Sequence, residues 1–196
     1  TDALCNGEAG SASLTATGGT GNIVFDWAGA DPTALLAGTY TVTASDDNGC
    51  VSTLDVTIAE PAGITVSVLT ADVTCNGGSD GTATLDIAGG TSPYIEQWYG
   101  IDPSNLSAGT YDVQVTDANG CKVTVSYTIN EPTAITVSLT IVDESASGAN
   151  DGSVVASATG GTAPHVYSWD TGDVGSSIAM LAPGTYTVTV TDNNGC

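Results

Sequence analysis

The sequence predicts an all-β fold made of tandem β-sandwich domains, and three observations support this. One stretch occurs three times, as GTYTVTASDDNGC at Gly38–Cys50, GTYDVQVTDANGC at Gly109–Cys121 and GTYTVTVTDNNGC at Gly184–Cys196. Each copy alternates apolar and polar residues and then reaches an Asn-Gly pair, the pattern of a half-buried strand that enters a tight turn. The composition is rich in Thr, Val, Ser, Gly and Asp, which favours strands and turns over helices.

A second marker repeats with the same period and indicates the domain boundaries. TIAEP at Thr57–Pro61 and TINEP at Thr128–Pro132 are 71 residues apart, as are Gly38 and Gly109 (109 − 38 = 71). Proline holds the preceding residue extended and cannot donate to a sheet, so each Glu-Pro pair is a natural joint. We therefore predict domains at 1–60, 61–131 and 132–196. The first is expected to lack its opening strand and the last its closing strand.

The middle domain supplies the expected strand order. A first strand carries Ile64, Val66 and Val68, and a second, GTATLDIAGG, turns Ala83, Leu85 and Ile87 inward before a Gly-Gly turn. The counterparts of the second strand are Ala12, Leu14 and Ala16 in the first domain and Val154, Ala156 and Ala158 in the third. The third domain has four extra residues (75 against 71), which we place in a surface loop after Trp169. Six to seven short strands in about 70 residues are typical of an Ig-like sandwich.

One tryptophan and one tyrosine per domain occupy fixed places on the expected strands. They are Trp27, Trp98 and Trp169, and Tyr40, Tyr111 and Tyr186. Such fixed positions favour a role in the core. The alternative for the tryptophans is an exposed stripe that stacks on sugars.

Four of the five cysteines fall in two pairs of nearly equal spacing. Cys5 and Cys50 are 45 residues apart (50 − 5), and Cys75 and Cys121 are 46 apart (121 − 75). We expect one disulfide in each of these two domains, formed in an oxidising, extracellular compartment. Each would stabilise its domain by roughly 4 kcal/mol on the chain-entropy model. Cys196 is then unpaired, and it is a free thiol, the product of a truncated context, or a link to another chain.

Charge excludes several classes of partner. The chain has 22 acidic residues against one basic residue, Lys122, for a formal net charge of −21. Nucleic acids are recognised through Lys and Arg, so the sequence excludes them as partners. No apolar run approaches the ~20 residues of a membrane-spanning helix, so no membrane insertion is expected. The start at Thr1 carries no export signal, which suggests an interior piece of a longer, processed protein.

No catalytic residues and no cofactor are predicted. The single histidine, His165, aligns with Tyr94 and is interpreted as a strand residue, and no nucleophile has a neighbouring base. The acidic turns at Asp46, Asp47, Asp117 and Asp192 offer oxygen ligands of the kind that calcium takes. The other interpretation is that these side chains make the local hydrogen bonds of the turns.

These motifs resemble the SprB repeat family of large surface adhesins in Bacteroidetes-type bacteria. In the middle domain the resemblance rests on Cys75, Gly77, Asp80-Gly81, Gly89-Gly90-Thr91, Pro93-Tyr94, Trp98, Leu106, Gly109-Thr110-Tyr111, Asp117 and Gly120-Cys121. The third domain departs from the pattern at Ala146, where a cysteine is expected. The closing hairpin alone is also similar to PKD-type sandwich domains.

The resemblance implies Ig-like domains strung along giant secreted proteins that are exported by the type IX system and used in adhesion and gliding. It implies a structural and adhesive stalk segment whose partners are the neighbouring repeats of the same chain. Because edge strands recur along such an array, self-association into a homo-oligomeric fibre or bundle is a further expectation. One alternative is a module that binds surface polysaccharide. Another is a non-catalytic spacer in a secreted polysaccharide-degrading enzyme.

Overall fold

A computed structural model describes residues 1–196, and it confirms the all-β class. The chain has thirteen strands and no helix, in five small sheets. The strands are β1 (Val24–Asp26), β2 (Gly38–Ser45), β3 (Val51–Ile58), β4 (Thr65–Ala71), β5 (Thr82–Ala88), β6 (Ile95–Gln97), β7 (Gly109–Thr116), β8 (Lys122–Ile129), β9 (Thr136–Val142), β10 (Gly152–Thr159), β11 (Val166–Trp169), β12 (Ser177–Leu181) and β13 (Val188–Thr191). No part of the chain forms a helix long and apolar enough to cross a membrane.

The chain folds as two compact units. The first contains Thr1–Val68, Leu85–Gly100 and Asp112–Ser126, and the second contains Leu69–Thr84, Ile101–Tyr111 and Tyr127–Cys196. Residues 61–131 therefore contribute to both units. The boundaries at residues 60 and 131 stay predictions, and we use them below only to name the three sequence repeats: repeat 1 (1–60), repeat 2 (61–131) and repeat 3 (132–196).

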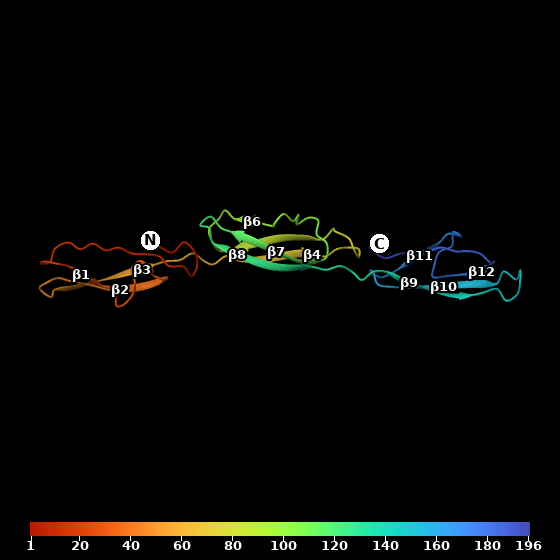
Figure 1. The fold of residues 1–196 in the computed structure, drawn as a ribbon, viewed down its shortest axis with the longest axis horizontal. Helices are drawn as coiled ribbons and strands as arrows, with labels where there is room; N and C mark the ends of the chain where they lie inside the picture. Colours follow the sequence, from red (N-terminus) through yellow and green to blue (C-terminus); the bar gives the residue numbers. More distant parts are fainter. The chain divides into compact units, whose positions relative to one another are not determined.

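In the first unit, the repeated GTY stretch forms a regular antiparallel hairpin. Strand β2 pairs with β3 from Gly38↔Ile58 to Ser45↔Val51, and β1 pairs with the other edge of β2 (Figure 1). Val42 and Ile58 are buried, as the alternation predicts. Leu54 lies four residues before Ile58, so strand alternation places it on the same face, but it is 56% exposed.

The strand expected through Ala12, Leu14 and Ala16 is absent. Only an isolated bridge between Gly10 and Leu35 forms in this stretch. The counterpart strands β5 and β10 each pair with an earlier strand, β4 or β9. Repeat 1 has no such strand, so the backbone groups of this segment find no ladder to join.

In the second unit, β9, β10 and β12 form one sheet in the order β12-β10-β9, and β11 pairs with β13. A buried cluster of Val154, Ala156, Trp169 and Ile178 lies between them, with Tyr167, Leu181, Tyr186 and Val188 packed against it. The extra residues of repeat 3 do not form only a loop. Their end is strand β12, which pairs with β10 across a bulge at Gly152 and so extends the single bridge seen between Gly81 and Leu106.

The alternation in β7 matches its burial. Val113 and Val115 are both fully buried, and Tyr111 is half-buried and stacks on Tyr127 with ring centroids 5.7 Å apart. In repeat 3 the equivalent strand, β13, begins only at Val188 and pairs with β11 alone, whereas β7 lies between β6 and β8. The three GTY tyrosines share one contact, in which the hydroxyl donates to the carbonyl four residues earlier: Tyr40 to Leu36, Tyr111 to Ser107 and Tyr186 to Ala182, at 2.8–2.9 Å.

Candidate functional site at the repeat junctions

The disulfides join successive repeats and do not close single repeats. Cys5 is bonded to Cys121, and Cys75 to Cys196, with Cα atoms 5.6 Å apart in both. The free cysteine is Cys50, which is exposed. The predicted pairs Cys5–Cys50 and Cys75–Cys121, and the predicted free Cys196, are therefore wrong.

The reason is the position of each cysteine along its hairpin. In repeat 1, Ala3 N–H donates to Ala59 O at 3.0 Å, which places Cys5 beside the end of β3. Cys50 immediately precedes the first residue of that strand. Eight strand residues span roughly 25 Å, whereas a disulfide needs Cα atoms within about 7 Å. Repeat 2 repeats the geometry, because Val73 N–H donates to Asn130 O at the end of β8 while Cys121 precedes its start.

The first junction lies within the first unit and surrounds the Cys5–Cys121 bond with hydrogen bonds. Asn119 Nδ2 donates to Leu4 O at 2.9 Å, so the turn of repeat 2 holds the backbone next to Cys5. On the other side, Gly7 N–H donates to Glu60 Oε2 at 2.6 Å and Asn6 Nδ2 to Pro61 O at 3.3 Å. The Cys-Asn-Gly loop of repeat 1 is thus bound to the Glu-Pro joint.

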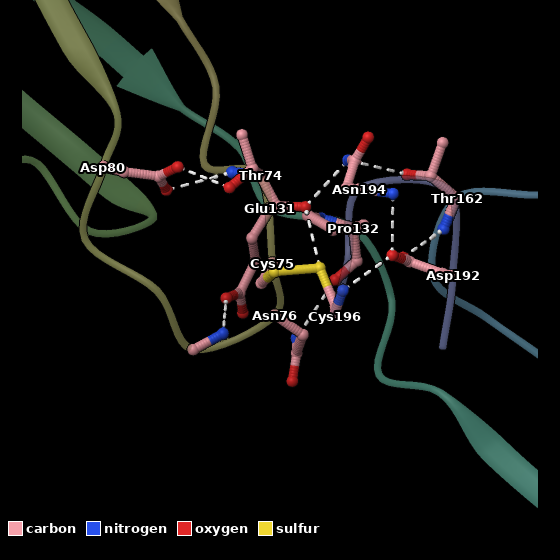
Figure 2. Close-up of a disulfide and its surroundings, with 11 residues drawn as sticks. Thr74, Cys75, Asn76, Asp80, Glu131, Pro132, Thr162, Asp192, Asn194 and Cys196 are labelled. Carbon is pink, nitrogen blue, oxygen red and sulfur yellow. Dashed lines mark hydrogen bonds between the residues drawn. A yellow bond between two sulfur atoms is a disulfide. The ribbon is translucent and has the colours of Figure 1, made fainter. Parts of the chain in front are cut away.

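The second junction, within the second unit, repeats these contacts one for one (Figure 2). Asn194 Nδ2 donates to Thr74 O at 3.0 Å. Asn76 Nδ2 donates to Pro132 O at 3.1 Å, and Gly77 N–H donates to a carboxylate oxygen of Glu131. Figure 2 shows the Asn194 side chain reaching from the last turn toward Thr74, next to the disulfide.

A buried aspartate shapes the turn that receives each loop. Asp117 Oδ1 accepts N–H bonds from Asn119 and Cys121, and Oδ2 accepts one from Thr91, all at 2.9 Å. Burial, the largest single effect, raises the pKa of Asp117, but the N–H donors together outweigh it and the pKa lies below its usual value. In repeat 3, backbone N–H donors led by Thr162 and Cys196 lower the pKa of Asp192 in the same way. The ionised carboxylate is therefore the form that holds the turn together.

The linker between repeats lies against the Gly-Gly turn. Gly90 N–H donates to Ala62 O at 2.7 Å, and Gly161 N–H donates to Thr133 O at 2.7 Å. A Cβ on Gly89 would lie 2.0 Å from Gly63 O, and one on Gly160 would lie 2.0 Å from Ala134 O. Glycine is required at both positions because the linker backbone passes where a side chain would be.

The acidic turns are occupied by hydrogen bonds from the protein itself. Asp46, Asp117 and Asp192 each accept three backbone N–H bonds, and Asp47 Oδ2 accepts one from Asn22. The chain has no group of three or more His, Cys, Asp or Glu side chains that could hold a metal ion. These carboxylates thus accept hydrogen bonds from their own turns, and calcium binding stays an untested prediction.

The three tryptophans and the single histidine take no part in the hydrogen bonds of the junctions. Trp169 is buried, while Trp27 and Trp98 are half-buried. His165 hydrogen-bonds Gly160 O through Nε2 at 2.8 Å, the role that the Tyr94 hydroxyl has toward Gly89 O. The histidine thus stabilises the Gly-Gly turn of repeat 3 through this hydrogen bond.

The cysteines and the Glu-Pro joints stand out in the sequence, whereas the role of the asparagines that bind at the junctions does not. Asn6 and Asn76 follow the first cysteine of their repeats, and Asn119 and Asn194 precede the last by two residues. Their repetition at fixed offsets was visible in the sequence. Which carbonyl each one reaches depends on the partner repeat, which spacing within one repeat does not reveal.

Comparison with known proteins identifies the repeat itself. The family model described as SprB repeat matches the chain three times, at residues 1–32, 67–103 and 138–174. A search of curated proteins finds no match. The three matched segments cover more than half of the chain and contain both Cys-Asn-Gly loops and their Ala146 counterpart. The chain belongs to the SprB repeat family.

Proposed function

We propose that this chain is a stalk segment of a long extracellular adhesin, in which cross-repeat disulfides carry load from one repeat to the next. The observation that supports the proposal is the junction, which recurs with the same cysteine, asparagine, glutamate and proline roles. A contact that recurs in register with the repeat serves an extended array better than an isolated binding site. The role is structural and adhesive, without catalysis.

The overlap of the two disulfide loops gives the stalk a short covalent path. The bonded cysteines are 116 residues apart in the first loop and 121 residues apart in the second. The segment from Cys75 to Cys121 belongs to both loops. A force applied at Cys5 passes through its disulfide to Cys121, back along 46 residues to Cys75 (121 − 75), and through the second disulfide to Cys196. Complete unfolding then extends this path to only about 160 Å, at about 3.5 Å per residue.

Disulfides also favour a location outside the cytoplasm, and we place the protein at the bacterial cell surface. Export by the type IX system and a role in gliding follow from the family resemblance. The net charge of −21 keeps such a chain soluble and discourages lateral association with its own kind. A homo-oligomeric fibre would therefore need screening by salt or cations.

Force spectroscopy on the whole chain, pulled from its two ends, tests this function. We expect unfolding to release about 46 residues between Cys5 and Cys196, and a reductant to release the rest of the 191 residues that separate them (196 − 5). Disulfides within single repeats would instead leave 100 residues in the path, 25 from Cys50 to Cys75 and 75 from Cys121 to Cys196. A release of about 350 Å before reduction, at about 3.5 Å per residue, would therefore refute the load path.

A second candidate function, binding of surface polysaccharide by the repeats, is supported by Trp27 and Trp98, which remain half-exposed while Trp169 is buried. Sugar rings stack on exposed indole faces. Titration of the chain with a surface polysaccharide, followed by tryptophan fluorescence, tests this function. A spectral change that Trp98→Phe reduces and Trp169→Phe leaves intact would support binding, and no change at saturation would refute it.

A further inference from the structure

Repeat 1 carries a third copy of the surface that receives a Cys-Asn-Gly loop. Asp46 accepts N–H bonds from Thr20, Asn48 and Cys50 at 2.9, 3.0 and 2.9 Å. Asp117 and Asp192 accept the same three bonds from the equivalent residues at 2.8–3.0 Å. The receiving turn is therefore already formed in repeat 1, with the geometry it has where a loop is bound.

The groups that bind the loop in the other two copies are unengaged in this one. Asn119 and Asn194 donate to a loop carbonyl, while the side-chain amide of Asn48 makes no hydrogen bond. Cys50 is a free, exposed thiol. Beside it lies a groove of about 190 Å³, lined by Gly18, Gly19, Asp46 and Cys50 among others.

The Gly-Gly turn of repeat 1 shows the same difference. A Cβ on Gly18 would have nothing within 4 Å, whereas one on Gly89 or Gly160 would collide with the linker backbone at 2.0 Å. Gly18 also has φ +86°, close to the +73° and +79° of its counterparts. The space that a linker fills in repeats 2 and 3 is thus open and correctly shaped in repeat 1.

We propose that this surface binds the Cys-Asn-Gly loop and Glu-Pro joint of a further SprB-type repeat and forms a disulfide through Cys50. Both occupied copies hold this kind of loop, Leu4–Gly7 in one and Thr74–Gly77 in the other. The chain's own two loops are engaged in disulfides. The third counterpart has Ala146 and Ser147 in place of Cys and Asn, so it has no thiol to offer.

The segment therefore has one free receiving surface, at Cys50, and no free Cys-Asn-Gly loop. It accepts one repeat at Cys50 and has no free loop to donate, so a second copy of the chain is excluded as the occupant unless a junction disulfide first opens. The inference concerns junction chemistry and does not depend on the adhesive role proposed above. The loop of repeat 3 cannot form a disulfide of this kind, because Ala146 replaces the donor cysteine.

The bond forms by thiol–disulfide exchange. The Cys50 thiolate attacks the sulfur of the incoming cysteine, which is held in a mixed disulfide with a small thiol such as glutathione. A new S–S bond forms, the old one breaks, and the small thiolate leaves with the electron pair and takes up a proton from solvent. Sulfur oxidation states balance because one disulfide replaces another.

The test extends the full chain by one repeat. Residues 61–131, followed by a second copy of residues 61–70, are placed before Thr1, so that repeat 1 gains a linker in natural register. After refolding in a glutathione redox buffer, we expect peptide mapping to show the added copy of Cys75 bonded to Cys50 and the added copy of Cys121 free. The matched control carries Cys75→Ala and Asn76→Ser in the added copy, as in repeat 3, and should leave Cys50 free or bound to glutathione.

A bond between the two cysteines of the added repeat, with Cys50 free, would overturn the proposal. Retention of Cys5–Cys121 and Cys75–Cys196 in the same map shows that the original part has folded.

A second measurement uses the unmodified chain and a peptide of residues 69–80. In a glutathione buffer, the peptide should occupy Cys50 at least about fivefold more than a scrambled peptide with the same cysteine, since one hydrogen bond contributes about 1 kcal/mol. Asn48→Ala should abolish this preference. Equal occupancy by both peptides, or adducts with glutathione only, would refute recognition by the loop.

Discussion

Cys75 is bonded to Cys196, 121 residues further along the chain, although Cys121 lies in its own repeat. The two cysteines of repeat 2 sit at opposite ends of strand β8, and each reaches a neighbouring repeat instead. Closing a loop of this length stabilises the native state by about 4–5 kcal/mol on the chain-entropy model. The two disulfides therefore stabilise the junctions between repeats as well as the folded state of the repeats they join.

Substitution of the first glycine in each Gly-Gly turn separates the effect of the linker from that of backbone strain. All three positions have positive φ, so an alanine costs about 1–2 kcal/mol at each for that reason alone. At Gly89 and Gly160 the new Cβ also meets the linker backbone at 2.0 Å, whereas at Gly18 it meets nothing. We expect Gly89→Ala and Gly160→Ala to lower the free energy of unfolding by a further 1–3 kcal/mol beyond Gly18→Ala.

Denaturant unfolding monitored by tryptophan fluorescence measures this difference, and Gly18→Ala is the matched control. If the three variants unfold at the same denaturant concentration, the linkers do not pass over the glycine turns in solution.

Stability toward acid should depend on the loop carboxylate of Asp102. Hydrogen bonds from the hydroxyl and backbone of Ser104 and from the Asn105 amide lower its pKa from 3.8 to about 2. Because the folded-state pKa is depressed, the stabilisation is complete above about pH 4 and disappears as the pH falls toward 2. Asp102→Asn should be less stable than the unmodified chain at pH 6 and equally stable near pH 2.

Urea unfolding of both proteins between pH 2 and pH 7 tests this dependence. A stability difference that stays constant across the range would show that the carboxylate charge does not contribute through this loop.

Much of the fold could be predicted from local pattern, because strand alternation and turn residues act over a few positions. The buried Val113 and Val115 and the Asn-Gly turns are examples. The strand expected at Ala12–Ala16 failed because a strand also needs a neighbour, which repeat 1 does not contain. The expectation that Leu54 is buried was wrong for a related reason. Strand alternation buries a residue only where another layer covers that face of the sheet.

The disulfide pairing could not be predicted because two assignments have the same regularity. Pairing within repeats leaves Cys196 free, and pairing each first cysteine with the last cysteine of the next repeat leaves Cys50 free. Spacing along the chain does not distinguish them. The fold does, because it places Cys5 beside the end of β3 and Cys50 before its start, and the eight residues of that strand hold them too far apart for a bond.

Repeat 3 should gain stability from a strand supplied after Cys196. Its apolar groove, about 600 Å³ and lined by Leu139, Trp169 and Tyr186 among others, corresponds to the face where Tyr127 stacks on Tyr111 in repeat 2. We expect a second copy of residues 122–130, appended after Cys196, to raise the free energy of unfolding by roughly 2 kcal/mol. Its four apolar side chains contribute about 1.5–3 kcal/mol each on burial, and ordering of the backbone offsets much of that gain.

Hydrogen exchange would locate the added strand, because amides within residues 184–186 should become protected. The control tail has serine in place of the copies of Val123, Val125, Tyr127 and Ile129. Equal stabilisation by both tails would contradict pairing in the groove.

Cleavage after Lys122 tests the central claim most directly, because this chain has no other lysine and no arginine. The protein is alkylated and denatured without reductant, cut with trypsin, and weighed by mass spectrometry. With Cys75 bonded to Cys196, residues 1–122 and 123–196 stay joined as one species with a single alkylated thiol at Cys50, and they separate only on reduction. Two separate fragments before reduction, with the alkyl group on Cys196, would show that the disulfides close single repeats and would contradict the account.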